Sequence, residues 1–421
     1  MENQKVMNRG FVILGAILIQ LALGAIYAWS VFTPSLKIAG WSSENTQWVF
    51  AVGLASFAIF MVFAGKKLKT WGPRTLSWMG GAILGLGYIL AGIIGGTNFI
   101  ALLILIGLIG GMGIGFAYVV PIAVGMRWFP DKKGMITGLA VAGFGFGAML
   151  WVKLAGSWGH LIQDLGLSTT FIIYGAAFAL MVLIGGIWMK FPPEGWNPPG
   201  IKVKKKLVTE DDTAEVVVTQ TEFTSNEMLK KAQFYLIFLT FVFSAGAGLM
   251  SIGLMKLYPM QALMDAGISE TAASAIAGTA MAVFFSLANG MGRILWGIIS
   301  DKLGRKLSII LMTGIQGITV ILFTYMAGSE YLLYLGATLI GFNFGGNFAL
   351  FPTITADTFG SKNVGQNYPF VFLAYGVGGI FGPILGGRMG DLNNFALAFT
   401  ISGVAVLIGT ILILFVKPAK H

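Results

Sequence analysis

Long apolar stretches recur along the chain and are separated by short polar segments. Each stretch is about 20 residues or longer, the length at which an α-helix crosses the hydrocarbon core of a bilayer. A membrane β-barrel would show shorter segments of alternating polarity instead. The pattern therefore predicts an all-α membrane protein with twelve transmembrane helices. The predicted spans are 11–33, 47–66, 75–95, 98–126, 134–157, 168–191, 234–257, 272–300, 306–327, 330–352, 364–388 and 394–416.

One long polar stretch, residues 192–232, separates the sixth predicted span from the seventh. It carries a lysine cluster followed by acidic residues and has too few apolar positions to fold alone. We predict a cytoplasmic linker between an N-terminal half, residues 1–191, and a C-terminal half, residues 233–421. Near its end, Thr224 and Glu227 have the spacing of a capping box, which predicts a short helix.

Composition supports this picture and excludes several classes of protein. Hydrophobic residues make up 56% of the chain and charged residues 10%, which no water-soluble domain of this length would show. With no cysteine and two histidines, we expect no disulfide, no metal site and no cofactor. No nucleophile or acid–base pair for catalysis is visible, so we do not expect an enzyme. The first apolar stretch lacks a small-residue cleavage site and is interpreted as a helix rather than a removed signal peptide.

The formal net charge of +10 is explained by membrane topology rather than by nucleic-acid binding. Nearly all Lys and Arg residues fall on the side of both termini and the linker, which the positive-inside rule places in the cytoplasm. The exceptions are Lys37, Lys256 and Arg388 on the other side, and Lys153 and Arg293 within spans. We expect a multi-pass inner-membrane protein whose basic face meets anionic lipid. Lys153 is predicted to extend to the outer interface.

Two loops repeat between the halves. The first repeat loop, 65–74, and the second, 297–306, match at their glycines and at the final basic residue. We interpret both loops as gates rather than ligands; the residues concerned are Gly65, Lys69, Gly72, Arg74, Asp301, Gly304, Arg305 and Lys306. Residues 129–134 and 359–365 form a second related pair. Such repeats predict two parallel six-helix halves with a substrate site between them.

Glycines crowd the predicted fourth, fifth and eleventh helices. Small residues allow helix backbones to approach closely within a membrane. We therefore hypothesise that these smooth helix pairs rock or slide during transport, rather than only packing statically.

Arg293 is the principal candidate for a functional residue. It lies about eight residues from the end of its predicted span, roughly 12 Å inside the membrane. No predicted span contains a buried carboxylate to pair with it, and an unpaired cation at this depth is costly. A small anionic substrate is the expected partner, held by the bidentate fork of the guanidinium. Asn289, one turn earlier, is expected to orient Arg293.

The repeat also places four aromatic rings in pseudo-equivalent positions. Tyr118 and Phe348 each lie eleven residues before the phenylalanine of a related loop, and Phe144 and Tyr375 each lie ten residues after its glycine. These rings predict a box for the organic part of a small acid, with tyrosine hydroxyls available to its carboxylate. Ordinary helix packing is the alternative interpretation. Weaker candidates for the site are Tyr27, Phe344, Asn343, Asn347 and Tyr368.

The repeat loops resemble the signature of the major facilitator superfamily. That signature has a glycine, an acidic residue three positions before a second glycine, and a basic pair. The second repeat loop fits through Gly297, Asp301 and Gly304, whereas Lys69 occupies the acidic position of the first.

Further segments resemble the oxalate/formate antiporter family, which is related to the monocarboxylate transporters. They are Tyr27–Ser30, Arg127–Gly134, Glu222–Leu229, Asn343–Gly346 and Asn367–Tyr368. The family's oxalate carriers bind their dianion between cations on the eighth and eleventh helices. Arg293 matches the first cation, but Tyr375 stands where the second is expected. One cation favours a monocarboxylate.

We therefore expect a secondary transporter of lactate, pyruvate or formate, working by alternating access. Related monocarboxylate carriers favour proton-linked transport, although Asn289 replaces an aspartate implicated in their proton coupling. Oxalate/formate-type exchange is the alternative, followed by a drug or sugar carrier or a membrane receptor of the same fold. The fold usually acts as a monomer.

Overall fold

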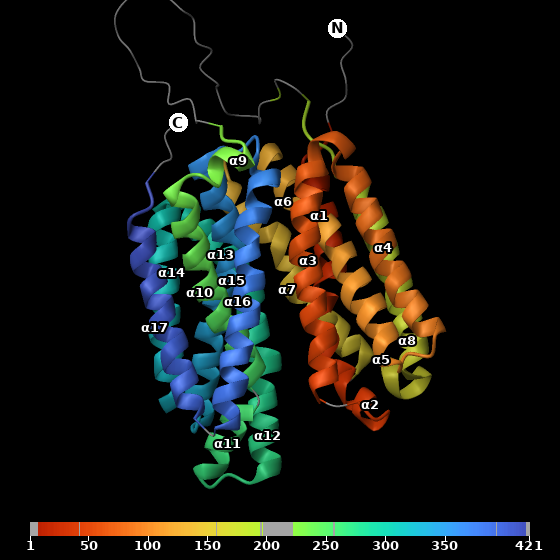
Figure 1. Ribbon diagram of the computed structural model, residues 1–421, viewed down its shortest axis with the longest axis vertical. Helices are drawn as coiled ribbons and strands as arrows, with labels where there is room; N and C mark the ends of the chain where they lie inside the picture. Colours follow the sequence, from red (N-terminus) through yellow and green to blue (C-terminus); the bar gives the residue numbers. More distant parts are fainter. Residues whose placement is uncertain are drawn as a thin grey trace, which may run out of the picture.

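A computed structural model describes residues 7–41, 43–156, 158–193, 196, 222–255, 257–392 and 394–417. Its long helices form two bundles that stand side by side (Figure 1). Lys256, His421 and most of the predicted linker lie outside the described residues. The predicted boundaries between the linker and the two halves are therefore not tested.

The first bundle contains the first six predicted spans. They are α1 (Gly10–Leu23) extended by the 3-10 helix η1 (Gly24–Val31), α3 (Ser43–Trp71), α4 (Pro73–Ile93), the run α5 (Phe99–Leu102), π-helix η2 (Leu103–Gly110) and α6 (Gly111–Trp128), α7 (Lys133–Ala155), and α8 (Leu161–Gly186). A short helix, α2 (Thr33–Ile38), follows η1.

The second bundle contains the remaining six. They are α10 (Ala232–Leu254), the run α12 (Glu270–Thr279), π-helix η3 (Ala280–Phe285) and α13 (Ser286–Leu303), α14 (Arg305–Met326), α15 (Glu330–Phe359), α16 (Val364–Asp391), and α17 (Phe395–Leu414). Two short helices, α9 (Ser225–Met228) and α11 (Leu257–Asp265), belong to connecting segments. Thr224 and Glu227 form the predicted capping box at the start of α9.

Among the described residues, 11 helical segments are long and apolar enough to cross a membrane. The twelfth long helix, α15, has 30 residues but carries Asn343, Asn347 and several threonines. Most of its second half is buried against neighbouring helices, so these polar groups are not exposed to lipid. The twelve-helix architecture predicted from the sequence is confirmed.

Several predicted span ends were wrong. Helix α3 continues to Trp71 instead of ending at 66, because helices continue beyond the apolar core where lysines reach toward water. Helix α8 begins at Leu161 instead of 168, with a kink at Gly166. Helix α15 continues through Pro352 to Phe359 instead of ending at 352. Proline is tolerated there because the surrounding helices support the interrupted backbone.

The two repeat loops have the same backbone geometry. Gly72 has φ 80° and ψ 155°, and Gly304 has φ 83° and ψ 154°. Each begins the next helix, α4 or α14, from the region of positive φ that glycine adopts without strain. Glycine at both positions is therefore required by the turn itself.

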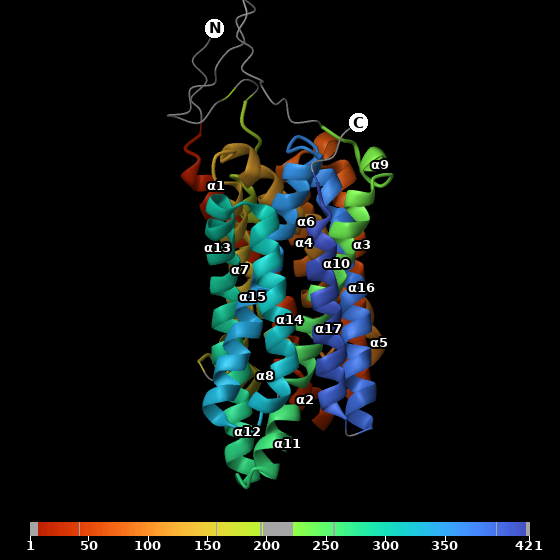
Figure 2. The same ribbon diagram turned by 90° about the vertical axis from the view of Figure 1, so that its left-hand side faces the viewer.

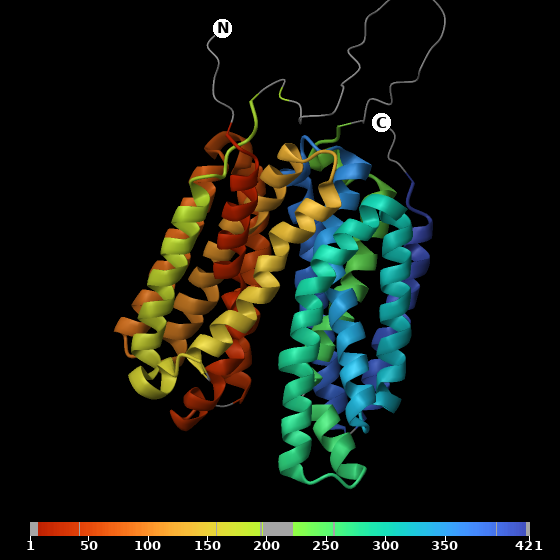
Figure 3. The same cartoon turned by 180° about the vertical axis from the view of Figure 1, so that it is seen from behind.

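The bundles meet at one end and diverge at the other (Figures 1 and 3). We call the end that bears the start of α1, the end of α17 and α9 the terminal face (Figure 2). Helix α7 packs on α13, and α3 packs on α16. Close contacts run from Gly134 and Gly297 at the terminal face to Gly145 and Gly290 near mid-depth.

Candidate functional site

Arg293 lies where α7 and α13 approach each other, and its side chain is 0% exposed. Its Nε donates to Asn289 Oδ1 at 3.2 Å, and its Nη1 donates to the Val141 carbonyl oxygen of α7 at 3.0 Å. Arg293 therefore bridges the two bundles. Its Nη2 is buried without a hydrogen-bond partner. No carboxylate forms an ion pair with it among the contacts found in the described part of the chain.

Two phenylalanines place their rings next to the guanidinium. Its central carbon lies 4.0 Å from the ring centre of Phe348 and 5.6 Å from that of Phe144. Phe348 comes from α15 and Phe144 from α7, so both bundles contribute. Aromatic faces stabilise a buried cation but offer little competition for its N–H donors. The remaining donors stay available for an anion.

Tyrosines from both bundles complete the surroundings. The hydroxyls of Tyr27 and Tyr375 are hydrogen-bonded to each other across the bundle interface. Tyr27 also packs edge-on against Phe144, with ring centres 5.1 Å apart. Tyr27 and Tyr118 both pack on Phe144, and Tyr375 packs on Phe348, so all three tyrosines lie next to the rings that contact the guanidinium.

Tyr118 is buried in the same cluster, with its ring centre 5.4 Å from that of Phe144. Its hydroxyl has no hydrogen-bond partner, and neither has that of Tyr368 on α16. Buried hydroxyls normally find a partner, because leaving one unpaired costs about 1–3 kcal/mol. Unpaired donors around a buried arginine are the arrangement expected of a polar ligand site.

Other predicted residues lie deeper within the second bundle. Phe344 packs on Phe348 and Phe285, Asn343 donates to the Leu339 carbonyl, and Asn347 contacts Ser244. None of these contacts reaches Arg293. A direct role for Phe344, Asn343 and Asn347 in binding substrate stays a prediction.

Two rings of this cluster were not predicted from the sequence as site residues. Phe57 of α3 lies 5.0 Å from Tyr118 between ring centres, and Phe372 of α16 lies 5.3 Å from Tyr118. A signal was present for both. Phe57 precedes Gly65 by the same eight positions that separate Asn289 from its repeat glycine, and Phe372 lies one helical turn before Tyr375. The Val141 carbonyl has no sequence signal, because every residue carries one.

The second repeat loop joins the bundles at the terminal face. Asp301 accepts hydrogen bonds from the Gly134 and Met135 backbone N–H groups at 2.9 and 2.8 Å. These groups start α7, so the carboxylate caps a helix of the other bundle and interacts favourably with its dipole. Arg305 pairs with Asp301 at 2.6 Å and with Asp357 at 3.0 Å. Asp301 thus joins the two bundles at the terminal face, while Arg305 pairs with it from within the second bundle.

The first repeat loop makes a different contact in the equivalent place. Lys69 Nζ donates to Asn363 Oδ1 at 2.5 Å, at the start of α16 in the other bundle. An ammonium group has no acceptor for backbone N–H groups and is unfavourable at the positive end of a helix dipole, so Lys69 cannot cap α16 as Asp301 caps α7 and donates to a side-chain oxygen. Gly65 packs directly on Gly365, because a Cβ there would lie 2.4 Å from the Gly365 carbonyl oxygen.

The last basic residue of each repeat loop faces its own bundle. Arg74 donates to the Ile187 carbonyl after α8, and Lys306 donates to the Leu414 carbonyl at the end of α17 at 2.5 Å. These contacts are pseudo-symmetric. Arg74 and Lys306 therefore bind helix ends within their own bundles and make no contact between the bundles in these hydrogen bonds.

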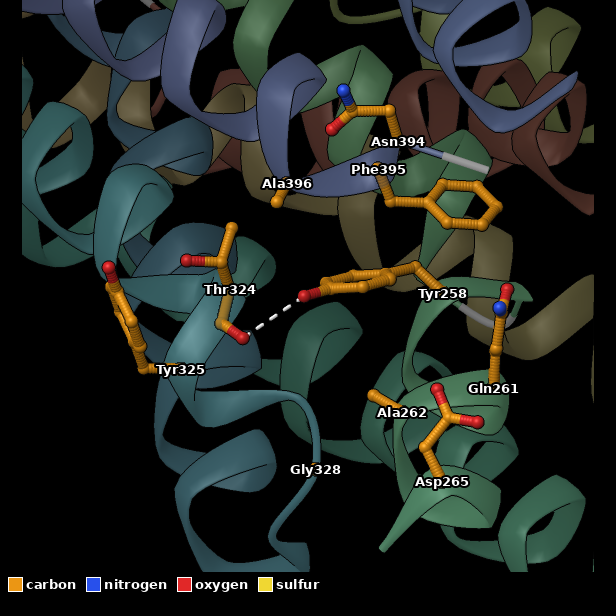
Figure 4. Close-up of a pocket in the computed structure, with 10 residues that line it drawn as sticks. All are labelled: Tyr258, Gln261, Ala262, Asp265, Thr324, Tyr325, Gly328, Asn394, Phe395 and Ala396. Carbon is orange, nitrogen blue, oxygen red and sulfur yellow. Dashed lines mark hydrogen bonds between the residues drawn. The ribbon is translucent and has the colours of Figure 1, made fainter. Parts of the chain in front are cut away.

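A separate hollow lies at the far end of the second bundle, between α11, α14 and α17 (Figure 4). Tyr258 donates to the Thr324 carbonyl at 3.0 Å along its wall, and Asp265 also lines it. None of the residues that line it belongs to the surroundings of Arg293, so this hollow is not an extension of the Arg293 site. The described residues contain no group of three His, Asp or Glu that could hold a metal ion.

Comparison with known proteins identifies several relatives. The chain is 28% identical over 377 residues to the uncharacterized MFS-type transporter YhjX of Escherichia coli, covering 89% of this chain and 86% of the relative. It is 27% identical over 414 residues to the oxalate:formate antiporter of Oxalobacter formigenes, covering 98% and 92%. Apicoplast pyruvate carrier 1 of Toxoplasma gondii is 25% identical over 373 residues, covering 78% and 66%.

The fold also matches a solved structure. A crystal structure of the transporter FucP in the outward conformation superimposes with a TM-score of 0.67 at 15% identity, covering 98% of this chain and 99% of that one. The family profile of the Major Facilitator Superfamily matches residues 12–284 and 245–421. Together with the twelve-helix architecture and the repeat loops, these matches show that the chain is a membrane transporter that belongs to the major facilitator superfamily.

Proposed function

We propose that this transporter carries small monocarboxylate anions such as lactate, pyruvate or formate across the inner membrane by alternating access. The observation that carries the proposal is Arg293. It is a fully buried cation with one unpaired Nη2 group and two aromatic neighbours, and its hydrogen bonds go to neutral oxygens only.

The charge of the site supports a monoanion. Every other polar group that we place around Arg293 is a neutral amide, hydroxyl or carbonyl. One carboxylate would neutralise the guanidinium, whereas a second carboxylate would be buried without a counter-charge. Tyr375 supplies a hydroxyl and no positive charge on α16.

The aromatic cluster supports a small organic substrate. Phe57, Phe144, Phe348 and Phe372 offer apolar surface to a methyl or short alkyl group. The unpaired Tyr118 hydroxyl can donate to the carboxylate or to a 2-hydroxyl group. We propose that Arg293 selects the charge and that the rings select the size.

The side from which substrate reaches the site in this conformation follows from the two ends of the bundles. With the termini in the cytoplasm, as the basic residues predict, the closed terminal face is the inner gate. Substrate then enters from the far face, where the bundles diverge, after the Tyr27–Tyr375 hydrogen bond opens. Neutralisation of Arg293 by the substrate lowers the free energy of closing the far face around it.

Proton-linked transport is the coupling that we propose first. With Asn289 beside Arg293 in place of a carboxylate, a proton would travel with the substrate or with the arginine–substrate pair. Exchange of one anion for another is the second candidate, and the similarity to the oxalate:formate antiporter over 98% of the chain favours it. Exchange requires no titrating side chain.

The test is uptake of labelled L-lactate into proteoliposomes with an inward proton gradient imposed or absent. We expect saturable uptake that the gradient drives, inhibited by pyruvate and formate but not by oxalate. Exchange of oxalate or formate without lactate uptake would contradict the monocarboxylate proposal and support the second candidate. Lactate uptake that ignores the proton gradient and requires internal anion would keep the substrate class and reject proton coupling.

A further inference from the structure

The turn between α15 and α16, residues 360–363, is where the linker and both bundles meet. Lys133 of α7 donates to Ser361 Oγ at 2.7 Å, and Arg127 of α6 donates to the Lys362 carbonyl at 2.8 Å. Lys69 of α3 donates to Asn363. Three cations of the first bundle therefore hold this turn when the terminal face is closed.

The end of the linker holds the same turn from the other side. Both carboxylate oxygens of Glu222 accept from the Lys362 backbone N–H, at 3.2 and 3.0 Å. The Phe223 carbonyl accepts from the Asn363 side chain at 2.8 Å. The Lys362 peptide is thus bound through its N–H group by the linker and through its carbonyl by Arg127.

Positive charges concentrate at this point. Lys69 and Arg127 bind adjacent residues of the turn, Asn363 and Lys362, so their charges and that of Lys362 lie close together and repel one another. Glu222 is the attractive neighbour of both Lys69 and Arg127. Closing the terminal face brings these cations together, and the free energy of closure therefore depends on Glu222.

The second repeat loop contains its own counter-charge. Asp301 occupies the position that corresponds to Lys69 and pairs with Arg305 while capping α7. The first repeat loop has no acid at this position. Its counter-charge must come from elsewhere in the chain.

We propose that Glu222, at the end of the linker, is the counter-charge of the first repeat loop and stabilises the conformation closed at the terminal face. The described end of the linker, Glu222 and Phe223, would then be part of the gate. This inference concerns the conformational equilibrium and holds whichever anion is transported.

The effect on the equilibrium arises from two sources. Glu222 lowers the electrostatic free energy of the closed form, in which Lys69 and Arg127 are adjacent to Lys362. It also fixes the backbone of the turn through the Lys362 N–H group before the terminal face closes. Closure then costs less conformational entropy. The electrostatic contribution is lost when Glu222 is replaced by glutamine, whereas the amide oxygen can still accept a hydrogen bond from the Lys362 N–H group.

The chain has no cysteine, so two introduced cysteines report only on the chosen sites. Thr70→Cys on α3 and Lys302→Cys on α13 place one exposed spin label on each bundle at the terminal face. Double electron–electron resonance of the full-length protein in nanodiscs then gives the populations of short and long distances. Glu222→Gln preserves shape but removes the charge, and we expect the ratio of closed to open forms to fall by about tenfold.

Two further variants make the result specific. Glu227→Gln, in the same segment, keeps the capping box, which accepts glutamine, and should leave the distances unchanged. Lys69→Asp places an acid at the start of α16, as Asp301 does at α7, and should restore the closed form in the Glu222→Gln background. Alone, Lys69→Asp should further increase the closed population, which tests the proposal even if Glu222→Gln fails to reach the membrane. Wild-type distances in Glu222→Gln, or no restoration by Lys69→Asp, would overturn it.

Discussion

We propose that Arg293 binds substrate but destabilises the folded protein. Its Nη2 group is buried without a hydrogen-bond partner, which costs about 1–3 kcal/mol. We expect Arg293→Gln to abolish saturable uptake while thermal unfolding of the ligand-free protein stays unchanged or shifts upward. Uptake and melting of the purified variant measure the two effects. Wild-type-like uptake would remove Arg293 from the mechanism, and a large loss of stability would show a structural role instead.

Tyr375 provides the test of substrate valence at the same scale. Its hydroxyl pairs with Tyr27, and its ring centre lies 5.5 Å from that of Phe348, which contacts Arg293. We expect Tyr375→Lys to add a second cation beside the site and to destabilise the empty protein by charge repulsion. Oxalate should then raise its melting temperature more than lactate does, reversing the wild-type order. Tyr375→Phe is the control, which lacks the hydroxyl but adds no charge. An unchanged order in Tyr375→Lys would mean that α16 does not set the valence.

At the scale of elements, the contact between α7 and α13 depends on glycines. A Cβ at Gly138 would lie 2.1 Å from the Arg293 carbonyl oxygen, whereas one at Gly145 would lie 3.2 Å from the Gly290 Cα atom. We expect Gly138→Ala to force the helices apart and reduce transport by about tenfold or more, and Gly145→Ala to have a smaller effect. Gly253→Ala is the control, since its Cβ would meet nothing within 4 Å. Transport rates of the three variants at equal expression give the comparison; equal effects at Gly138 and Gly253 would contradict the steric account.

The repeat loops show how much of each element could be predicted. Their glycines were identified from spacing alone, and Gly72 and Gly304 have nearly the same φ and ψ because the same turn recurs. Their contacts could not be predicted in this way. Asp301 and Lys69 occupy corresponding positions, yet one caps α7 and the other donates to Asn363, since each meets a helix that is distant in sequence.

At the scale of the whole molecule, alternating access requires the closed terminal face to open. Lys132→Cys on the first bundle and Lys302→Cys on the second allow a short, reducible cross-linker to join them. We expect uptake to stop when the cross-link forms, because α7 and α13 can then no longer separate. Uptake should recover when the cross-link is reduced. The same reagent between Lys132→Cys and Lys190→Cys, both in the first bundle, should leave uptake unchanged. Full transport with the bundles cross-linked would exclude rocking about this contact.

The sequence by itself determined the class of protein, the twelve spans and the repeat, because spanning length and turn chemistry are local properties of the chain. It also identified Arg293, since a cation deep in an apolar helix is unusual wherever the helix packs. The tertiary structure decided which groups surround that cation. The Val141 carbonyl, the Phe57 and Phe372 rings and the Tyr27–Tyr375 pair reach the site only through packing between bundles. Such contacts depend on relative helix positions, which the periodicity of a single helix does not encode.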